Sequence, residues 1–361
     1  MKGQLKSAGR VIVTIALALG IGAIIIQISN GNAIEAFEVL FNSAFGNERA
    51  LANTLLAATP LIFTGLATLV AFKAGIFNIG VEGSLYLGAF AAAWVGFTFT
   101  DLPGPVLIPL ALVVAGTVGG LWALIPGFLK ARLRVDEVVS TIMLNYVAII
   151  FCDYLVTGPF MAPGMSNAMS PEVAAQAQLP RLVERSQLNV AFIVALGVFV
   201  IVLLLMRRST FGFEIRMMGS NPVFARWSGM PVGKIVLLVF FVSGFIGGLA
   251  GWGQALGVHY RFQSGFSRGF GYDGIVIALL GRNSPVGVLF AALFFGALRS
   301  GSSTMEMFTN VPRDLIDILI AVIIFIVAID IGFDWLKKRQ PRPAPSAPQA
   351  PQTPQASLPA A

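Results

Sequence analysis

Charged residues are scarce in this sequence of 361 residues, because Asp, Glu, Lys and Arg together make up only 11% of it. A typical soluble domain has about 25% of these residues, and the mean hydropathy here is +0.82. This composition excludes an ordinary water-soluble protein. The chain also has one cysteine and one histidine, which excludes an intrachain disulfide and predicts no metal site.

Motifs for catalysis or nucleotide binding are also missing. A P-loop has the form GxxxxGK followed by Ser or Thr, and the nearest string, residues 229–235, has the wrong spacing and lacks the hydroxyl residue. No nucleophile stands in a recognisable pattern with a base. We therefore expect that this chain is not an enzyme and that it needs no cofactor.

Long apolar stretches dominate the sequence instead. Crossing a bilayer as a helix takes about 20 apolar residues, and nine stretches reach or approach that length. They are residues 11–28, 51–72, 79–99, 105–128, 138–157, 190–206, 235–258, 286–300 and 315–333. The expected fold class is all-α, a polytopic transmembrane helical bundle.

A tenth apolar run, residues 274–280, is too short to cross a membrane alone. Basic residues collect on the cytoplasmic side of membrane proteins, so the basic ends around Lys6 and Lys338 should share that side. Nine crossings would separate them. We therefore expect about ten spans, one of them broken and glycine-rich, with both termini cytoplasmic. The net charge of +7 then reflects cytoplasmic loops and requires no nucleic acid.

Three regions follow from this topology. Residues 1–50 are expected to form an N-terminal helix and an extracytoplasmic loop, and residues 51–333 the transmembrane domain. Residues 334–361, rich in Pro, Ala and Gln, are expected to be a disordered cytoplasmic tail. The first apolar stretch could be a signal peptide, but its length and the lack of a clear cleavage site favour a retained helix.

The largest expected cytoplasmic loop, residues 207–234, contains signals for two short helices. Asn221 is a good N-cap, Pro222 suits the first helical position, and Gly229 suits a left-handed stop. Gly219 should separate this helix from a preceding one at 211–218. The helix could dock a cytoplasmic partner, or it could be an amphipathic connector. If it docks, Val223, Phe224 and Trp227 would form the apolar face that enters a groove on the partner. The small side chain of Ala225 would allow close approach, and Arg226 would pair with an acidic rim of that groove.

Few polar residues lie within the expected spans. Asn78 stands one turn before Glu82, which predicts that both share a helical face, and Asn145 and Tyr146 lie in the middle of another span. A charge in hydrocarbon costs about 3 kcal/mol or more, so such residues face a cavity or a partner. They could line a polar path, or they could join helices by hydrogen bonds.

Four segments resemble the permeases of ribose, branched-chain amino acid and nucleoside ABC importers. The first two are more similar to nucleoside permeases than to sugar permeases. They are AGIFNIGVEGSLYLGA (74–89), VDEVVSTIMLNYVA (135–148), MMGSNPVFARWSGM (217–230) and GYDGIVIALLGRNSPVGVLFAALFFG (271–296). The resemblance implies a fold like that of type II ABC importers, in the inner membrane.

The resemblance also implies partners and a substrate. It implies a second permease, ATP-binding subunits under residues 207–234, and a substrate-binding lipoprotein over residues 158–189 on the outside. A nucleoside would pass a path lined by Asn78, Glu82, Asn145 and Tyr146. Permeases for a sugar or an autoinducer remain alternatives. A secondary transporter is disfavoured because the spans have few carboxylates for a proton relay.

Overall fold

The computed structural model describes residues 20–27, 32–165, 167–308, 318, 321 and 322. Among them there is no strand, only two isolated β-bridges. The helices are α2 (Ala33–Phe45), α3 (Glu48–Lys73), α4 (Val81–Thr98), α5 (Gly104–Leu133), α6 (Glu137–Thr157), η1 (Ala175–Ala177), α7 (Ala191–Arg208), α8 (Thr210–Ser220), α9 (Pro222–Trp227), α10 (Val232–Gln254), η2 (Ala255–His259), α11 (Phe270–Leu280) and α12 (Pro285–Phe308). The predicted all-α class is confirmed for this part of the chain.

Six of these helices are long and apolar enough to cross a membrane: α3, α5, α6, α7, α12, and α10 together with η2. Helix α4 has 18 mostly buried residues, and α11 has only 11. The predicted stretches 11–28 and 315–333, and the tail 334–361, lie wholly or mostly outside the described residues. The chain is therefore a multi-pass helical protein, and the number of ten spans stays a prediction.

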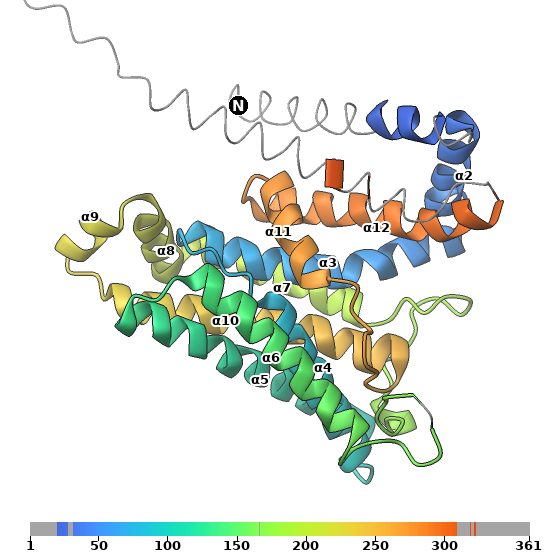
Figure 1. Ribbon diagram of the computed structural model, residues 1–361, viewed down its shortest axis with the longest axis horizontal. Helices are drawn as coiled ribbons and strands as arrows, with labels where there is room; N and C mark the ends of the chain where they lie inside the picture. Colours follow the sequence, from blue (N-terminus) through green and yellow to red (C-terminus); the bar gives the residue numbers. More distant parts are fainter. Residues whose placement is uncertain (1–19, 28–31, 166, 309–317, 319–320, 323–361) are drawn as a thin grey trace, which may run out of the picture.

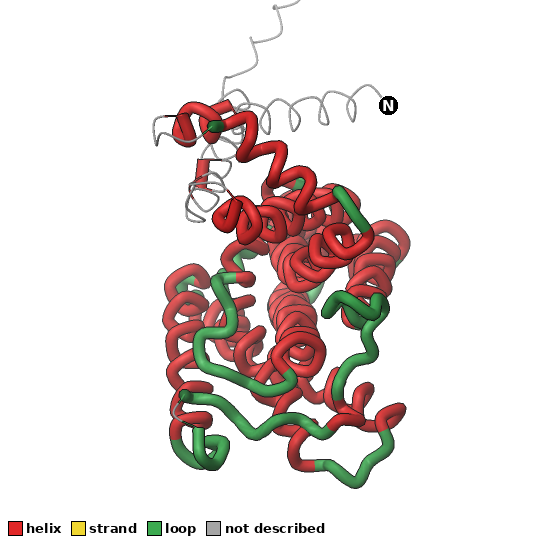
Figure 2. The backbone as a smooth tube through the Cα atoms, turned by 90° about the vertical axis from the view of Figure 1, so that its right-hand side faces the viewer, coloured by secondary structure: helices red, strands yellow, loops and turns green. Residues whose placement is uncertain are grey.

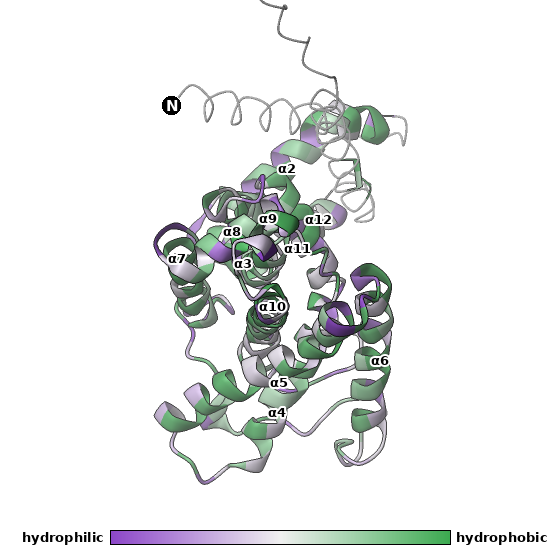
Figure 3. Ribbon diagram, turned by 90° about the vertical axis from the view of Figure 1, so that its left-hand side faces the viewer, coloured by the Kyte–Doolittle hydropathy of each residue, from purple (hydrophilic) through white to green (hydrophobic). Residues whose placement is uncertain are grey.

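The long helices run between the two ends of the bundle, with α5 and α6 inclined to α3 and α12, and α8 and α9 lie at one end (Figure 1). We call this the docking end, which faces the viewer in Figure 3. The C-terminal ends of α3, α5 and α7 meet the start of α10 here, so Lys73, Arg134, Arg208 and Lys234 gather at this end. Long loops cross the opposite end, which we call the loop end (Figure 2).

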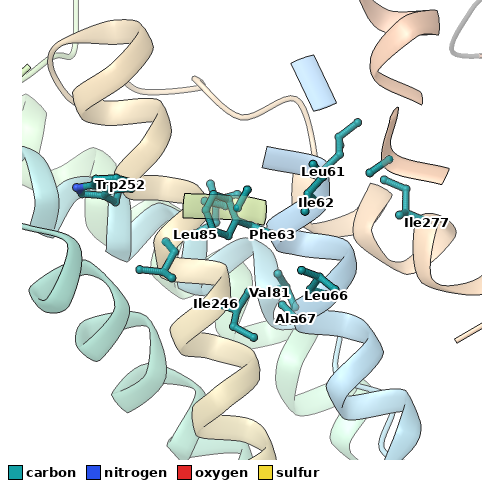
Figure 4. Close-up of a cluster of buried hydrophobic side chains, with 14 of the residues drawn as sticks. Leu61, Ile62, Phe63, Leu66, Ala67, Val81, Leu85, Ile246, Trp252 and Ile277 are labelled. Carbon is teal, nitrogen blue, oxygen red and sulfur yellow. The ribbon is translucent and has the colours of Figure 1, made fainter. Parts of the chain in front are cut away.

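Helices α3 and α10 form the centre of the bundle. Most of their apolar length is buried, 78% and 72%, against 33%, 28% and 22% for α5, α6 and α7. The largest buried side chains of α3, α4, α10 and α11 meet in one cluster, which includes Phe63, Leu85, Trp252 and Ile277 (Figure 4). The outer helices expose apolar faces instead, as expected of surfaces in contact with lipid or another subunit.

Glycines allow α4, α5 and α10 to approach one another closely. A Cβ atom on Gly248 would overlap the carbonyl oxygen of Ala115 in α5, and one on Gly251 would overlap that of Leu85 in α4. Small residues are a common device for close helix packing within membranes. Glycines recur in the sequence at residues 116, 119 and 120 and at residues 244, 248 and 251, a pattern typical of close helix packing, and the structure shows that packing.

The first part of the described chain holds one helix that the sequence did not predict. The segment expected as a loop before residue 51 contains α2, which Asn32 caps by accepting hydrogen bonds from the Ile34 and Glu35 N–H groups at 3.1 and 3.4 Å. Its small buried face packs on α12, where Leu40 contacts Gly301. The expected loop is therefore partly a helix, because it has both a cap and an apolar stripe.

The segment between α6 and α7 is tied down across the loop end. Backbone N–H groups of Ser170, Val173 and Leu179 donate to carbonyl oxygens of Phe262, Tyr260 and Leu256 at 2.8–3.0 Å. The N–H of Ala174 donates to the Gly96 carbonyl at 3.0 Å. This segment, over which a binding protein was predicted to sit, is therefore an ordered cover over the ends of α4 and α10.

Candidate translocation and docking sites

Residues 74–80, the α3–α4 link, place unwound backbone inside the bundle. The Asn78 side chain is 1% exposed. Its Nδ2 donates to Ser243 Oγ of α10 at 2.9 Å, and its Oδ1 accepts from the Gly80 N–H at 2.8 Å. The prediction that Asn78 shares a helical face with Glu82 is wrong, because α4 begins only after this link.

Helix α6 supplies further partners for the same backbone. Asn145 is fully buried, donates from Nδ2 to the Ile79 carbonyl at 2.9 Å and accepts from the Gly83 N–H at 2.8 Å. Thr141, one turn earlier, accepts from the Ile79 N–H at 3.3 Å. A buried peptide group without a partner costs about 1–3 kcal/mol, so these bonds make the break before α4 tolerable.

Glu82 joins the beginning of α4 to the beginning of α11. Glu82 is only 2% exposed. Its carboxylate accepts hydrogen bonds from Ser267 Oγ at 2.6 Å and from the Gly271 N–H at 2.5 Å. The Ser267 hydroxyl oxygen in turn accepts from the N–H groups of Gly269 and Phe270 at 3.2 Å. An anionic group is stabilised at a helix N-terminus, so Glu82 caps the half-length helix α11 from a distant part of the chain.

Three of the four predicted pathway residues therefore come together in one place. We call Asn78, Glu82, Thr141, Asn145, Ser243 and Ser267 the polar cluster. Tyr146 does not join it, because it lies on the outer face of α6 and is 58% exposed. The cluster holds two broken helices in register, and each of its polar side chains bonds to backbone or to a neighbouring side chain.

The sequence interpretation missed half of this cluster. Ser243 was visible as the one hydroxyl residue in α10, and Thr141 as the polar residue one turn before Asn145. Ser267 belongs to the irregular segment before α11 and carried no signal in the sequence. Its role depends on tertiary contact with Glu82, which lies far away along the chain.

An ion pair closes the other side of the first turn of α11. Arg299 of α12 pairs with Asp273, and its guanidinium lies 5.1 Å from the ring centre of Phe270. Both charged side chains are largely shielded from solvent. The N-terminus of α11 is therefore held by Glu82 of α4 on one side and by α12 on the other.

The docking end carries the two short helices that the sequence predicted. Asn221 accepts a hydrogen bond from the Phe224 N–H at 2.9 Å, Pro222 is the first residue of α9, and Gly229 has φ +80°. Val223, Phe224 and Trp227 are 64%, 53% and 86% exposed. The predicted cap, stop and apolar face of α9 are all confirmed.

Two details of this loop differ from the predictions. Gly219 does not separate α8 from α9, because it is helical and belongs to α8. A Cβ atom there would overlap the Lys73 carbonyl oxygen and come within 3.1 Å of Ala74. Ala225 is fully buried against this chain, so it does not face a partner.

Gly219 thereby connects the docking end to the polar cluster. It lies against the start of the α3–α4 link, where Gly75 has φ +71° and where a Cβ atom would be 3.2 Å from the Gly219 Cα. The same link leads within a few residues to Asn78 and then to Glu82. A displacement of α8 would therefore act on the backbone that the polar cluster holds.

Comparison with known proteins then decides the family. Residues 50–328 match the family described as the permease component of branched-chain amino acid transport systems. This chain belongs to that family. The match covers α3 to α12, and therefore includes both the polar cluster and the docking helices of this permease.

Several transport proteins resemble this permease over most of its length. It is 39% identical over 320 residues to the guanosine ABC transporter permease protein NupP of Bacillus subtilis. The aligned region covers 88% of this chain and 92% of NupP. It is 34% identical to the glucose ABC transporter permease protein TsgB13 of Haloferax volcanii, covering 88% and 86%. It is 29% identical over 274 residues to NupQ, another guanosine permease protein of B. subtilis, covering 72% and 84%. No solved structure matches the chain significantly.

Proposed function

We propose that this permease is the membrane-spanning subunit of an ATP-driven importer that carries a nucleoside into the cell. The observation that supports the proposal most directly is the 39% identity to a guanosine permease along almost the whole length of both chains. The similarity to a glucose permease makes a sugar the second candidate, and an autoinducer remains a more distant one. Nucleosides and sugars both carry hydroxyl groups, for which a polar path would have to supply hydrogen-bond partners.

ATP hydrolysis is assigned to a separate subunit, since this chain has no P-loop sequence. The exposed side chains of Val223, Phe224 and Trp227 fit an apolar groove on such a subunit, as a short amphipathic helix does. Arg226 is exposed beside them and fits an acidic rim. Force from the ATP-binding subunit would enter through α9 and α8 and reach the α3–α4 link at Gly219.

Two further partners complete the proposed importer. A second permease is supported by the fact that NupP and NupQ, two permease proteins of one bacterium, both resemble this chain. A substrate-binding lipoprotein would sit over residues 158–189, which form the ordered cover at the loop end. The importer would lie in the cytoplasmic membrane, with the docking end and both termini inside.

The four predicted pathway residues divide into two groups in this proposal. Asn78, Glu82 and Asn145 set the positions of α4 and α11 beside the path, so their side chains become available to substrate only when those helices move. Tyr146 is exposed in the isolated chain and offers a ring on which a nucleobase can stack. We therefore expect Tyr146→Ala to raise KM for uptake, and Asn145→Ala to lower the maximal rate.

Copurification and reconstitution test the proposal. The complex would be isolated from its native membranes through a tag on this chain, and its subunits identified by mass spectrometry. It would then be placed in right-side-out proteoliposomes with ATP in the lumen, together with its binding protein. We expect uptake of labelled guanosine or another nucleoside that requires ATP and survives collapse of the proton gradient.

The same experiment separates the alternatives. Uptake of glucose or ribose without uptake of any nucleoside would assign the sugar. Uptake by this chain alone that a protonophore abolishes would make it a secondary transporter instead.

A further inference from the structure

A pocket lies at the docking end, apart from the polar cluster. Its volume is about 360 Å³, which falls within the range of about 300–1,000 Å³ typical of small-ligand sites. Three elements form it: the last turns of α5, the end of α9, and the segment that begins α10. The exposed apolar residues of α9, Val223, Phe224 and Trp227, are not part of its lining.

The lining of this pocket is strongly basic. Arg132, Arg226 and Lys234 come from three different elements, and no residue of the lining is acidic. At the beginning of α6, which follows α5 directly, Glu137 pairs with Lys130 at 2.5 Å. Like charges brought together without a counter-ion repel one another, so the pocket favours an anion.

The backbone adds to this preference. Helix α10 begins at the pocket, and no side chain caps its N-terminus. Gly233, in the first turn, lines the pocket without a side chain that would keep a ligand away from the backbone. The N-terminus of a long helix carries a partial positive charge that favours phosphate groups, and here it stands beside three cationic side chains.

The pocket also has an apolar side, and exposed apolar residues follow one helical turn away on α5 and α10. Met230 and Leu237 belong to its lining. Beyond it, Phe128 of α5 and Leu238 of α10 are 52% and 50% exposed on helices long enough to span a membrane. A free phosphate ion would not use this surface, whereas the acyl chains of a lipid would cover it.

We propose that this pocket binds the phosphate group of an anionic phospholipid from the cytoplasmic leaflet, with the acyl chains lying along α5 and α10. Basic pockets between transmembrane helices on that side suit such head groups. The lipid phosphate bridges Arg226 of the docking loop to Arg132 and Lys234 of the spanning helices. It therefore fixes the docking loop to the membrane domain. The inference requires that the chain spans a membrane, and it does not depend on the substrate.

Native mass spectrometry of the complex tests this proposal. The wild-type complex and the Arg132→Gln/Lys234→Gln variant would be delipidated stepwise in detergent, and phosphatidylglycerol would be titrated back. We expect the wild type to bind one phosphatidylglycerol per copy of this chain and the double variant to bind it at least ten-fold more weakly. Arg207→Gln/Arg208→Gln removes the same charge at the end of α7, outside the pocket, and should bind as the wild type does.

Two further arms separate the sources of the phosphate group. Millimolar inorganic phosphate should fail to displace the lipid, and Leu237→Gln should weaken lipid binding while all three cations remain. Displacement of the lipid by inorganic phosphate would overturn the lipid assignment in favour of a soluble phosphate. Equal lipid binding by the wild type and the Arg132→Gln/Lys234→Gln variant would overturn the site itself.

Discussion

The carboxylate of Glu82 stands where two interrupted helices meet, and at the scale of single residues it is the clearest example of a structural role for a buried charge. It satisfies the Ser267 hydroxyl and the Gly271 N–H at 2.6 and 2.5 Å. A carboxylate has only acceptor oxygens, which suits a site where donors converge. The environment therefore uses both of its oxygens as acceptors.

Replacing Glu82 with Gln should destabilise the protein. The amide retains one acceptor oxygen, so either Ser267 or Gly271 loses its partner, at a cost of about 1–3 kcal/mol. We expect a lower melting temperature in detergent for Glu82→Gln, and no change for Glu38→Gln on the exposed face of α2. An unchanged melting temperature with a raised KM for uptake would instead mean that Glu82 contacts substrate directly.

Gly219 is the second single residue with a clear role, because its lack of a side chain lets α8 contact the start of the α3–α4 link. A Cβ atom there has no room against the Lys73 carbonyl, so Gly219→Ala should push α8 away from the α3–α4 link. We expect normal membrane insertion but loss of both transport and substrate-stimulated ATPase activity in the reconstituted complex. Gly197→Ala is the control, since nothing lies within 4 Å of a Cβ atom at that position of α7.

At the scale of elements, α9 has one side fixed to this chain and another side free. Ala225 is fully buried, whereas Trp227 is 86% exposed. Asn221 and Pro222 begin this six-residue helix, which is too short to be stable without its cap and its packing. The two sides of α9 should therefore respond differently to substitution.

The comparison of Trp227→Ala with Ala225→Arg tests this division. Trp227→Ala should leave the melting temperature of this chain unchanged and reduce copurification of the ATP-binding subunit. Ala225→Arg should lower the melting temperature, because a long charged side chain has no space at a fully buried position. Full copurification in Trp227→Ala and in the Val223→Ser/Phe224→Ser variant would show that the loop is only a connector.

At the scale of the whole molecule, the two ends of the bundle differ in charge and in structure. The docking end gathers basic residues at the ends of α3, α5, α7 and α10, while the loop end holds the ordered cover. Because basic residues collect on the cytoplasmic side, this asymmetry predicts the orientation of the protein in the membrane.

Cysteine labelling in intact cells measures that orientation. Cys152 is buried, so Cys152→Ser gives a background in which Asp101→Cys marks the loop end and Ser228→Cys marks the docking end. A membrane-impermeant maleimide should label Asp101→Cys in intact cells, and Ser228→Cys only after the membrane is opened. The reverse pattern would invert the proposed topology. Reporter fusions after Gly31 and Arg339 should likewise report opposite sides if both termini are cytoplasmic.

The sequence by itself determined the all-helical membrane class, most helix positions, and the cap and stop of α9. These depend on local quantities: the length of an apolar run, the hydrogen bonds of Asn221 within its own turn, and the positive φ of Gly229. The close packing of α4, α5 and α10 was also visible, because glycines recur at helical spacing.

Only the tertiary structure decided what the polar and small residues contact. It placed Asn78 in an unwound link, Glu82 at the start of α11, Tyr146 on the outside, and Ala225 on the buried side of α9. Helical periodicity cannot reveal where a helix begins inside a bundle, because buried helices are apolar on all sides. The decisive partners, such as Ser267 for Glu82, lie far apart along the chain and are brought together only when the helices pack.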